Sequence, residues 1–340
     1  MQQPTVYDVA KRAGVSIATV SRALHGSRRV RPDSEARVIA AVTELGYRPN
    51  ALARGLRLQS SGTIGIVVPG VANPFFAAVA EAVETELQSS GRGLLLANSL
   101  RDPVVEASRL QELFERQVDG LIVVPCDLRR SAKALAAAAD RVPVVQLDRR
   151  VDGVSIDWVG IDDASGFKQI LDHLVERGAH SVHLISAAPI TSTARRRLAA
   201  FKSMALRRHL VSSPAPALEE FTTAWGRDAG LALIETGKLP DAIVCGDDAI
   251  ALGVLQACYR TGIVVPRDVM VTGFDDVIFS TISNPPLTTV RQPVELLARE
   301  SLAMLAERAE GSIAPVRRIA LEPTLIVRAS TVGVEDVSAP

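Results

Sequence analysis

Residues whose types and spacing suit contact with DNA bases lie at the start of the chain. Ser16 is placed to cap a helix over residues 16–24. In such a helix Ile17, Ala18 and Arg22 project outward from the N-terminal half, while the apolar residues pack inward. We therefore expect these outward side chains to read bases.

A preceding segment completes the motif that would position them. Over residues 5–13, Val6, Val9, Ala10 and Ala13 recur at helical spacing and form one apolar face. Gly14 then allows a sharp turn into the second helix. The pattern predicts a helix-turn-helix, although an ordinary helical hairpin is the commoner meaning of two such segments taken alone.

The distribution of charge favours the DNA-binding interpretation. The whole chain has 38 basic and 38 acidic residues, yet residues 1–60 hold ten Lys or Arg against four Asp or Glu. By difference, the remainder carries 28 basic and 34 acidic residues. A basic head on a mildly acidic body is expected when one small module meets phosphates.

Length and composition bound the rest of the chain. At 340 residues and 47% hydrophobic, it can form a small head and a body of two lobes. No apolar run reaches the length of a membrane span, and the N-terminus lacks the pattern of a secretory signal. We expect a reduced cytoplasmic compartment, with the three cysteines as buried free thiols.

Motifs typical of enzymes are missing from the sequence. It contains no P-loop, no Gly-x-Ser-x-Gly elbow and no zinc-ligand spacing. The five histidines are scattered, and we expect a surface location for His180 and His183 beside a probable strand. An enzyme is therefore disfavoured, and no catalytic residue, metal or cofactor is predicted.

The body reads as alternating strands and helices. A third helical segment runs from Pro32 to about Leu45, with Val38, Ile39 and Val42 on its predicted apolar face, and a short helix-compatible stretch follows. From residue 62 onward two series of apolar strands alternate with helices, which predicts two α/β lobes with mostly parallel sheets. The predicted strands cover residues 64–68, 94–97, 121–124, 144–147, 182–185, 242–244 and 269–272.

Several of these motifs, in order along nearly the whole chain, resemble the LacI/GalR family of bacterial transcription regulators. The resemblance implies a helix-turn-helix head over residues 1–47, a hinge helix and linker over 48–61, and a periplasmic-binding-protein-like core of two doubly wound lobes over 62–332. The upper lobe would take residues 62–161 and 291–323, and the lower lobe 162–290 and 324–332. The matching motifs are Tyr7-Asp8-Val9-Ala10, Gly14-Val15-Ser16, Thr19-Val20-Ser21-Arg22, residues 47–54, Asn73-Pro74-Phe75-Phe76, residues 118–122, Arg197-Leu198 with Phe201, residues 271–276 and residues 286–290.

The resemblance also assigns contacts with operator DNA. It places the recognition helix in the major groove, with Arg22 on a guanine edge and Ile17 and Ala18 against a thymine methyl or merely filling space. Its hinge would fold in the minor groove of a near-palindromic operator, where Leu56 wedges between bases. Gly55, where many relatives have serine, costs roughly 1 kcal/mol against alanine in a helix interior, so this hinge should melt easily. The assigned DNA contacts are Thr5, Ser16, Ile17, Ala18, Thr19, Ser21, Arg22, Ala53, Leu56 and Arg57.

A pocket for a small sugar is implied between the lobes. Aromatic faces would cover an apolar sugar face, while carboxylates and arginines would bind hydroxyls. The set most resembles ribose binders, and Asp247, where an asparagine is expected, argues against a negatively charged effector. The residues implied are Asn73, Phe75, Phe76, Asp148, Arg149, Arg197, Phe221, Asp247, Asp275 and Gln292.

Each pocket residue also has a plainer interpretation. Phe75 and Phe76 suit a hydrophobic core, Asp148 a loop cap, and Trp225 packing against a neighbouring helix. A purine or nucleoside effector is the alternative ligand class, although Arg149 speaks mildly against a flat base. A transport-type binding protein is a further alternative, disfavoured by the basic head.

The predicted mechanism links the two parts. The protein would act as a homodimer, since residues after 327 show no leucine heptad for a tetramer. Effector closure of the cleft would change the separation of the two hinges and release the operator. Whether the ligand releases or strengthens DNA binding is not encoded in one sequence, and ribose-type sugars favour release.

Overall fold

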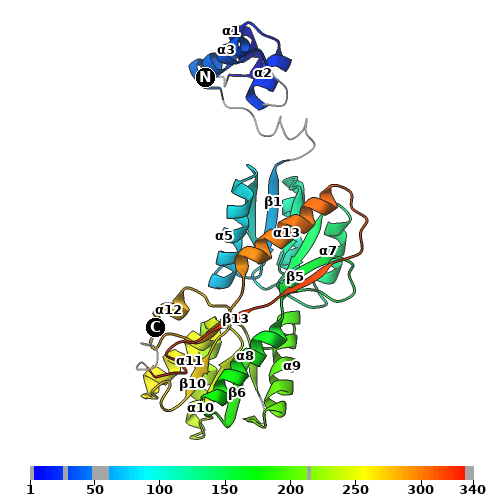
Figure 1. The fold of residues 1–340 in the computed structure, drawn as a ribbon. Coiled ribbons are helices and arrows are strands. Elements are labelled where there is room, and N and C mark those ends of the chain that lie inside the picture. Colours follow the sequence, from blue (N-terminus) through cyan, green and yellow to red (C-terminus); the bar gives the residue numbers. More distant parts are fainter. Residues whose placement is uncertain (1–3, 26–29, 48–60, 213–215, 334–340) are drawn as a thin grey trace. The chain divides into compact units, whose positions relative to one another are not determined.

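The computed structural model describes residues 4–25, 30–47, 61–212 and 216–333. The chain divides into two units, Met1–Ser61 and Gly62–Pro340, which are a helical head and an α/β core (Figure 1). Ala53, Leu56 and Arg57 of the predicted hinge lie outside the described residues. Among the residues that are described, no helix combines the length and apolar character needed to cross a membrane.

The head is a helix-turn-helix followed by a third helix. Its elements are α1 (Val6–Ala13), α2 (Ile17–His25) and α3 (Pro32–Leu45). Thr5 and Asp8 form a reciprocal capping box at the start of α1, and Gly14 ends it at a φ of 64°, a left-handed conformation that glycine adopts without strain. As predicted, Ser16 Oγ accepts a hydrogen bond from the Thr19 amide at 3.2 Å. The buried core residues are Val9, Ala10, Ala13, Val20, Val38 and Ala41.

One residue of the predicted apolar face of α3 is misplaced. Ile39 is 55% exposed, whereas Val38 and Ala41 are buried. The buried face follows positions 38, 41, 42 and 45, a helical spacing in which residue 39 falls on the flank. The expectation for Ile39 was therefore wrong.

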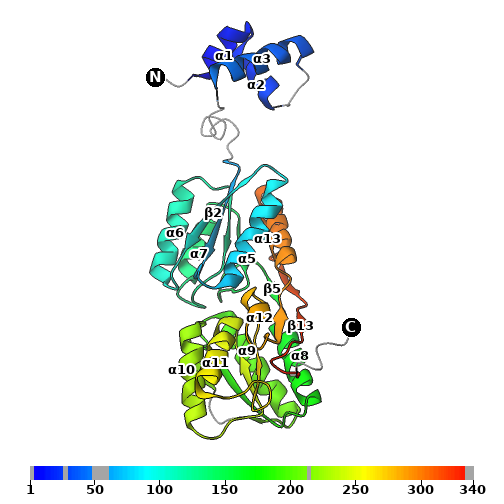
Figure 2. The ribbon, with the colours of Figure 1, turned by 90° about the vertical axis from the view of Figure 1, so that its left-hand side faces the viewer.

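The upper lobe of the core is built on a six-stranded parallel sheet (Figure 2). Helices α5 (Pro74–Gln88) and α13 (Val294–Ala309) cover the face of the sheet to which Ile64, Ile66 and Val68 of the strand over residues 63–68 point. Helices α6 (Pro103–Glu115) and α7 (Ala132–Ala139) cover the opposite face, to which Val67 points. Successive strand residues thus face opposite layers, as the pleat requires. The strands in spatial order are β12 (Arg318–Leu321), β5 (Asp157–Ile161), β4 (Val144–Leu147), β3 (Gly120–Val123), β1 (Thr63–Val68) and β2 (Gly93–Asn98).

The lower lobe repeats this arrangement on a five-stranded sheet. Its strands are β10 (Met270–Thr272), β9 (Ala242–Cys245), β6 (Ser181–Ala187) and β7 (Val211–Ser212), with β8 (Ala217–Glu219) also paired to β6. Helices α8 (Asp163–Glu176) and α9 (Ser192–Arg207) pack on one face, and α10 (Thr223–Glu235) and α11 (Asp248–Thr261) on the other. The short helix α12 (Phe279–Ile282) follows β10. Every strand pair in both large sheets is parallel, which confirms the predicted fold class.

The chain passes between the lobes at three places. The crossings lie between β5 and α8, between β11 (Thr289–Arg291) and α13, and between β12 and β13 (Thr324–Ile326). Strands β11 and β13 pair antiparallel beside the crossings. The cleft between the lobes is therefore bordered by three connections that can act as a hinge.

His183 corrects another expectation. It lies in β6 and is buried rather than at the surface, and burial lowers the pKa of its imidazole. Alternation along β6 places it inside because both faces of this parallel sheet are covered by helices. Trp225 packs as predicted, with its indole NH donating to the carbonyl of Ser186 at 3.0 Å.

Candidate functional site

The DNA-facing candidates of the head lie on one short helix and its flanks. Ser16, Ile17, Ala18 and Arg22 are exposed, and Thr19 and Ser21 are half-buried. Arg22 Nε donates to the carbonyl of Ala18 at 3.1 Å. These residues occupy α2 and its N-cap, while exposed Thr5 caps α1. The structure thus displays the polar and apolar side chains expected for base contact.

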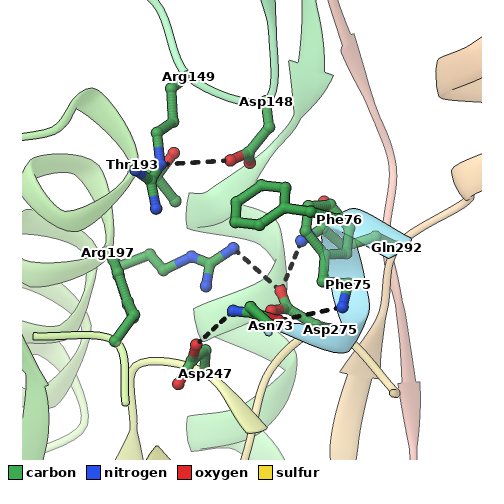
Figure 3. Close-up of a pocket in the computed structure, with 11 residues that line it drawn as sticks. Asn73, Phe75, Phe76, Asp148, Arg149, Thr193, Arg197, Asp247, Asp275 and Gln292 are labelled. Atoms are coloured by element: carbon green, nitrogen blue, oxygen red, sulfur yellow. Dashed lines mark hydrogen bonds and ion pairs between the residues drawn. The ribbon is translucent and has the colours of Figure 1, made fainter. Parts of the chain in front are cut away.

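The ten residues predicted for a ligand pocket line one cavity between the two lobes (Figure 3). Several lining positions follow the carboxyl ends of parallel strands, among them Asp148 after β4, Asp247 after β9 and Asp275 after β10, which is where ligands bind in doubly wound sheets. The empty space at the site is about 240 Å³, a value that includes space open to solvent. An eleventh lining residue, Thr193, was not predicted.

Two residues cap helices and also join the lobes. Asn73 Oδ1 accepts from the Phe75 amide at 3.0 Å at the start of α5, and Asp247 Oδ1 accepts from the Ile250 amide at 2.9 Å at the start of α11. The remaining atoms meet across the cleft, where Asn73 Nδ2 donates to Asp247 Oδ2 at 3.2 Å. Each side chain thereby fixes a helix N-terminus and one wall of the cavity at once.

Arg197 is the most heavily bonded cation of the site. Its Nε donates to Asp163 Oδ1 at 2.9 Å, and Nη1 donates to the Gly246 carbonyl at 2.6 Å. Nη2 lies 3.5 Å from Asp275 Oδ1, which also accepts from Gln292 Nε2 at 2.6 Å. Burial alone would lower the pKa of Arg197, but Asp163, Asp275 and Asp148 together raise it. Arg197 therefore stays charged in the folded protein.

The carboxylates of the cavity titrate abnormally because they are buried. Burial raises the pKa of Asp247 to about 6 and raises that of Asp275 well above its ordinary value, against the opposing effect of Arg197 on both. The pKa of Asp148 is raised by burial despite Arg149 and Arg197. Behind them, burial raises the pKa of Asp248 to about 7, although three hydrogen-bond donors oppose it. These groups favour hydrogen-bond donors, such as hydroxyls, over further negative charge.

Arg149 lies between two aromatic rings. Its guanidinium carbon is 5.6 Å from the centre of the Phe76 ring and 5.7 Å from that of Phe221, within cation–π range. Burial lowers the pKa of Arg149. Phe75 and Phe76 also belong to the core of the upper lobe, so the core and pocket interpretations both hold for them. Asp148, at a φ of 59°, holds its carboxylate 3.7 Å from Arg149 Nε.

Several polar atoms of the lining are buried without a hydrogen-bond partner in the protein. They are Asp148 Oδ1, Arg149 Nε, Thr193 Oγ1 and Gln292 Oε1. Acceptors and donors of this kind match a ligand that both donates and accepts hydrogen bonds. Thr193 lies in the first turn of α9, four residues before Arg197. Residues four apart share one face of a helix, and this spacing from Arg197 was the sequence feature that could have placed Thr193 in the pocket.

Metal and thiol chemistry find no support in the described parts of the chain. There, no group of three or more His, Cys, Asp or Glu side chains is arranged to hold a metal ion. Cys126, Cys245 and Cys258 are free and buried, and burial raises the pKa of all three thiols. Such thiols are inert at neutral pH.

Comparison with known proteins matches both units. A model of the bacterial regulatory proteins of the lacI family matches residues 5–50, and a periplasmic binding protein-like domain matches residues 171–331. The chain is 32% identical over 332 residues to the HTH-type transcriptional repressor PurR of Haemophilus influenzae (strain PittEE), covering 96% of this chain and 98% of the relative. It is 31% identical over 328 residues to the ribose operon repressor of Escherichia coli (strain K12), covering 96% and 99%.

A solved structure agrees with these relatives. The crystal structure of the lac repressor dimer bound to operator and the anti-inducer ONPF matches with a TM-score of 0.87 and 28% identity, covering 97% of this chain and 99% of that one. The helix-turn-helix head, the two-lobed core and the similarity along nearly the full length lead to one conclusion: the chain belongs to the LacI family of bacterial regulatory proteins.

Proposed function

We propose that this protein is a cytoplasmic transcriptional repressor that binds a near-palindromic operator as a homodimer and is released from it by a ribose-like pentose. The observation that carries the ligand half is the cavity between the lobes, which is lined by three carboxylates, two arginines and three phenylalanines. It is a regulator with no catalytic step assigned to any residue. Both the repressor names of its relatives and the exposed face of α2 support the DNA half.

Arg22 is the residue we expect to contribute most to base recognition. Its guanidinium lies on the exposed face of α2, and an arginine fork pairs with the two acceptors on a guanine edge. Ile17 and Ala18, also exposed, offer methyl groups suited to thymine. The basic charge of the head supplies the phosphate contacts that set affinity.

A neutral polyhydroxy ligand fits the charges of the cavity. Asp148, Asp247 and Asp275 outnumber Arg149 and Arg197, and Arg197 already donates to protein carboxylates and a carbonyl. A phosphorylated ligand would add negative charge beside buried carboxylates whose pKa values are already raised. Adjacent hydroxyls instead donate to the carboxylates and accept from the arginines.

A purine or nucleoside is the second candidate, and one observation favours it. The rings of Phe76 and Phe221 both face the position of Arg149 and could stack on a planar base. The relatives include both a PurR repressor and a ribose operon repressor at nearly equal identity. We place ribose first because a purine carbonyl needs hydrogen-bond donors from the protein. The cavity has more carboxylates, which accept hydrogen bonds from hydroxyls, than arginines, which donate them.

Thermal-shift titration of the purified protein tests the ligand class. We expect ribose to raise the melting temperature in a saturable way, because a ligand that binds only the folded state stabilises it. Hexoses, nucleosides and purines are titrated in parallel. A shift with a purine or a nucleoside and none with ribose would replace the pentose by the purine class.

An operator selected from fragmented genomic DNA tests the direction of control. Saturating ribose should weaken binding of the protein to that fragment, measured by fluorescence anisotropy at fixed salt. Binding that is unchanged or tighter with ribose would overturn release as the mechanism.

A further inference from the structure

One buried carboxylate serves two arginines that lead to different parts of the core. Asp163 begins α8 directly after the first crossing between the lobes, and its side chain has no exposed surface. Oδ1 accepts from Arg197 Nε at 2.9 Å, and Oδ2 accepts from Arg196 Nε at 2.6 Å. Consecutive residues of a helix diverge by roughly 100°, so the two guanidinium groups point to different places.

Arg197 leads from Asp163 into the ligand cavity. Its Nη1 donates to the Gly246 carbonyl, and its Nη2 forms the ion pair with Asp275 that Figure 3 shows; both partners lie in the lower lobe. A ligand that bonds to this guanidinium therefore acts on a side chain whose orientation Asp163 fixes.

Arg196 leads from Asp163 to the upper lobe. Its Nη2 donates to the backbone carbonyl of Asp148 at 3.3 Å, and its guanidinium carbon lies 5.2 Å from the centre of the Trp158 ring. The Trp158 indole NH donates to the same carbonyl at 3.2 Å. Asp148 is a cavity residue with a left-handed backbone at φ 59°, a conformation that other bonds must hold.

The same end of α9 carries further contacts between the lobes, which we call the seam. The Leu128 amide donates to the Ile190 carbonyl at 2.8 Å, and the Arg150 amide donates to Ser192 Oγ at 2.9 Å. Arg195 forms an exposed ion pair with Asp152 at 3.2 Å. A shift of α9 against the upper lobe would break these bonds together.

We propose that Asp163 and Arg196 are positioning residues that connect the pocket arginine, Arg197, to the seam, so that a ligand held in the cavity fixes how the two lobes meet. The link runs from Arg197 through the two oxygens of Asp163 to Arg196, and from there to Asp148 and Trp158. It gives the proposed repressor its route from ligand to lobe arrangement. Only the ligand arm of the test rests on the proposed function.

Hydrogen exchange at the Leu128 and Arg150 amides measures the seam directly in the full-length protein. Without ligand, Arg196→Met should accelerate exchange at both amides at least tenfold, about the factor expected for loss of a charge-assisted bond. Arg195→Met is the matched control, since it removes a neighbouring ion pair between the lobes that is exposed and weak. It should change the same rates by less than about threefold.

A second variant keeps the experiment decisive if Arg196→Met does not fold. Arg196→Lys retains a positive charge beside Asp163 but loses the planar fork that reaches two partners, so it should also loosen the seam. The Ile66 and Leu184 amides, in the central strands of the two lobes, report global unfolding and should exchange as in the wild type.

The ligand arm uses ribose. In the wild type, ribose should slow exchange at Leu128 and Arg150, and in Arg196→Met it should still raise the melting temperature but no longer slow those amides. Exchange in both Arg196 variants equal to that in Arg195→Met overturns the link. If ribose fails to bind even the wild type, the proposed pentose falls, while the comparison without ligand still decides the link.

Discussion

Asp247 combines a structural task with an unusual titration. It caps α11 and accepts a hydrogen bond from Asn73 in the other lobe, and burial raises its pKa to about 6 from the ordinary value of 3.8. Between these two pH values the folded protein binds the proton more tightly than the unfolded chain. The contribution of Asp247 to the free energy of unfolding therefore falls as pH rises through this window and stays low above it.

Asp247→Asn should remove this dependence. The amide oxygen can keep the helix cap, and the side chain no longer loses a proton. Each unit of pKa shift corresponds to about 1.4 kcal/mol, so the stability of the variant relative to the wild type should rise by about 1–3 kcal/mol between about pH 4.5 and about pH 7.5. Urea unfolding at both pH values measures it. A difference that is the same at both would show that Asp247 is not titrating in this range.

The site residues could be predicted because each stands in a recognisable motif at a strand end or helix start. Asn73 within Asn-Pro-Phe-Phe and Asp275 after β10 are examples, and the structure brings them to one cavity. Thr193 was missed because a threonine in the first turn of a helix is usual there for its own reasons. The double role of Asp163 depends on the fold of α9 against α8, which no local pattern encodes.

At the scale of elements, α10 and α11 approach so closely that side chains do not fit between them. A Cβ on Gly226 would lie 2.1 Å from the Ile250 carbonyl oxygen, and one on Gly253 would lie 2.2 Å from the Thr223 carbonyl oxygen. Both obstacles are backbone atoms and cannot rotate away. The close packing fixes α11, whose N-terminal cap is Asp247.

Gly253→Ala should therefore destabilise the core by about 1–3 kcal/mol or more, because the helices must separate. Gly230→Ala is the graded control on the same helix pair. The Cβ of an alanine at position 230 would lie 3.0 Å from the Ala257 methyl group, which is a side-chain atom. The higher helix propensity of alanine than of glycine offsets part of the resulting strain. Thermal unfolding of both variants measures the difference. Equal stability of the two would contradict the backbone clash.

Strands with mostly apolar runs were predictable, and two strands of the upper sheet that contain charged residues were not. β1 and β4 are mostly apolar and were found within one residue of their bounds. β5 and β12 were missed, since Asp157 and Arg318 interrupt their patterns and Asp157 instead pairs with Arg308 of α13 at 2.7 Å. Their strand identity comes from pairing between segments about 160 residues apart, as in the register Trp158 to Arg318.

At the scale of the whole molecule, the residues proposed to contact DNA and those proposed to contact the ligand belong to separate units. The exposed face of α2 lies in Met1–Ser61, and all eleven cavity residues lie in Gly62–Pro340. In the proposed function, regulation is therefore a coupling free energy between two sites rather than competition for one.

A reciprocal pair of variants should separate the two activities. Arg22→Ala should lose about 10- to 100-fold in affinity for the operator, corresponding to about 1–3 kcal/mol for a base contact, and keep the ribose-induced thermal shift. Arg197→Ala should lose that shift and the response to ribose while still binding the operator. Arg197→Lys, which keeps the charge beside Asp163, serves as a second variant if the alanine form is unstable. A normal response in both would remove Arg197 from the site.

The three crossings between lobes also determine when each part can fold during synthesis. The head is contiguous and its helices contact one another, so it can fold early on the ribosome. The upper lobe needs β12 to complete its sheet, and the lower lobe needs the Ser330 hydroxyl, which bonds to Val271 at 2.6 Å. Neither lobe is complete until the segments that contain β12 and, for the lower lobe, Ser330 have been synthesised. A nascent chain thus carries a finished DNA-binding module before the part that controls it exists.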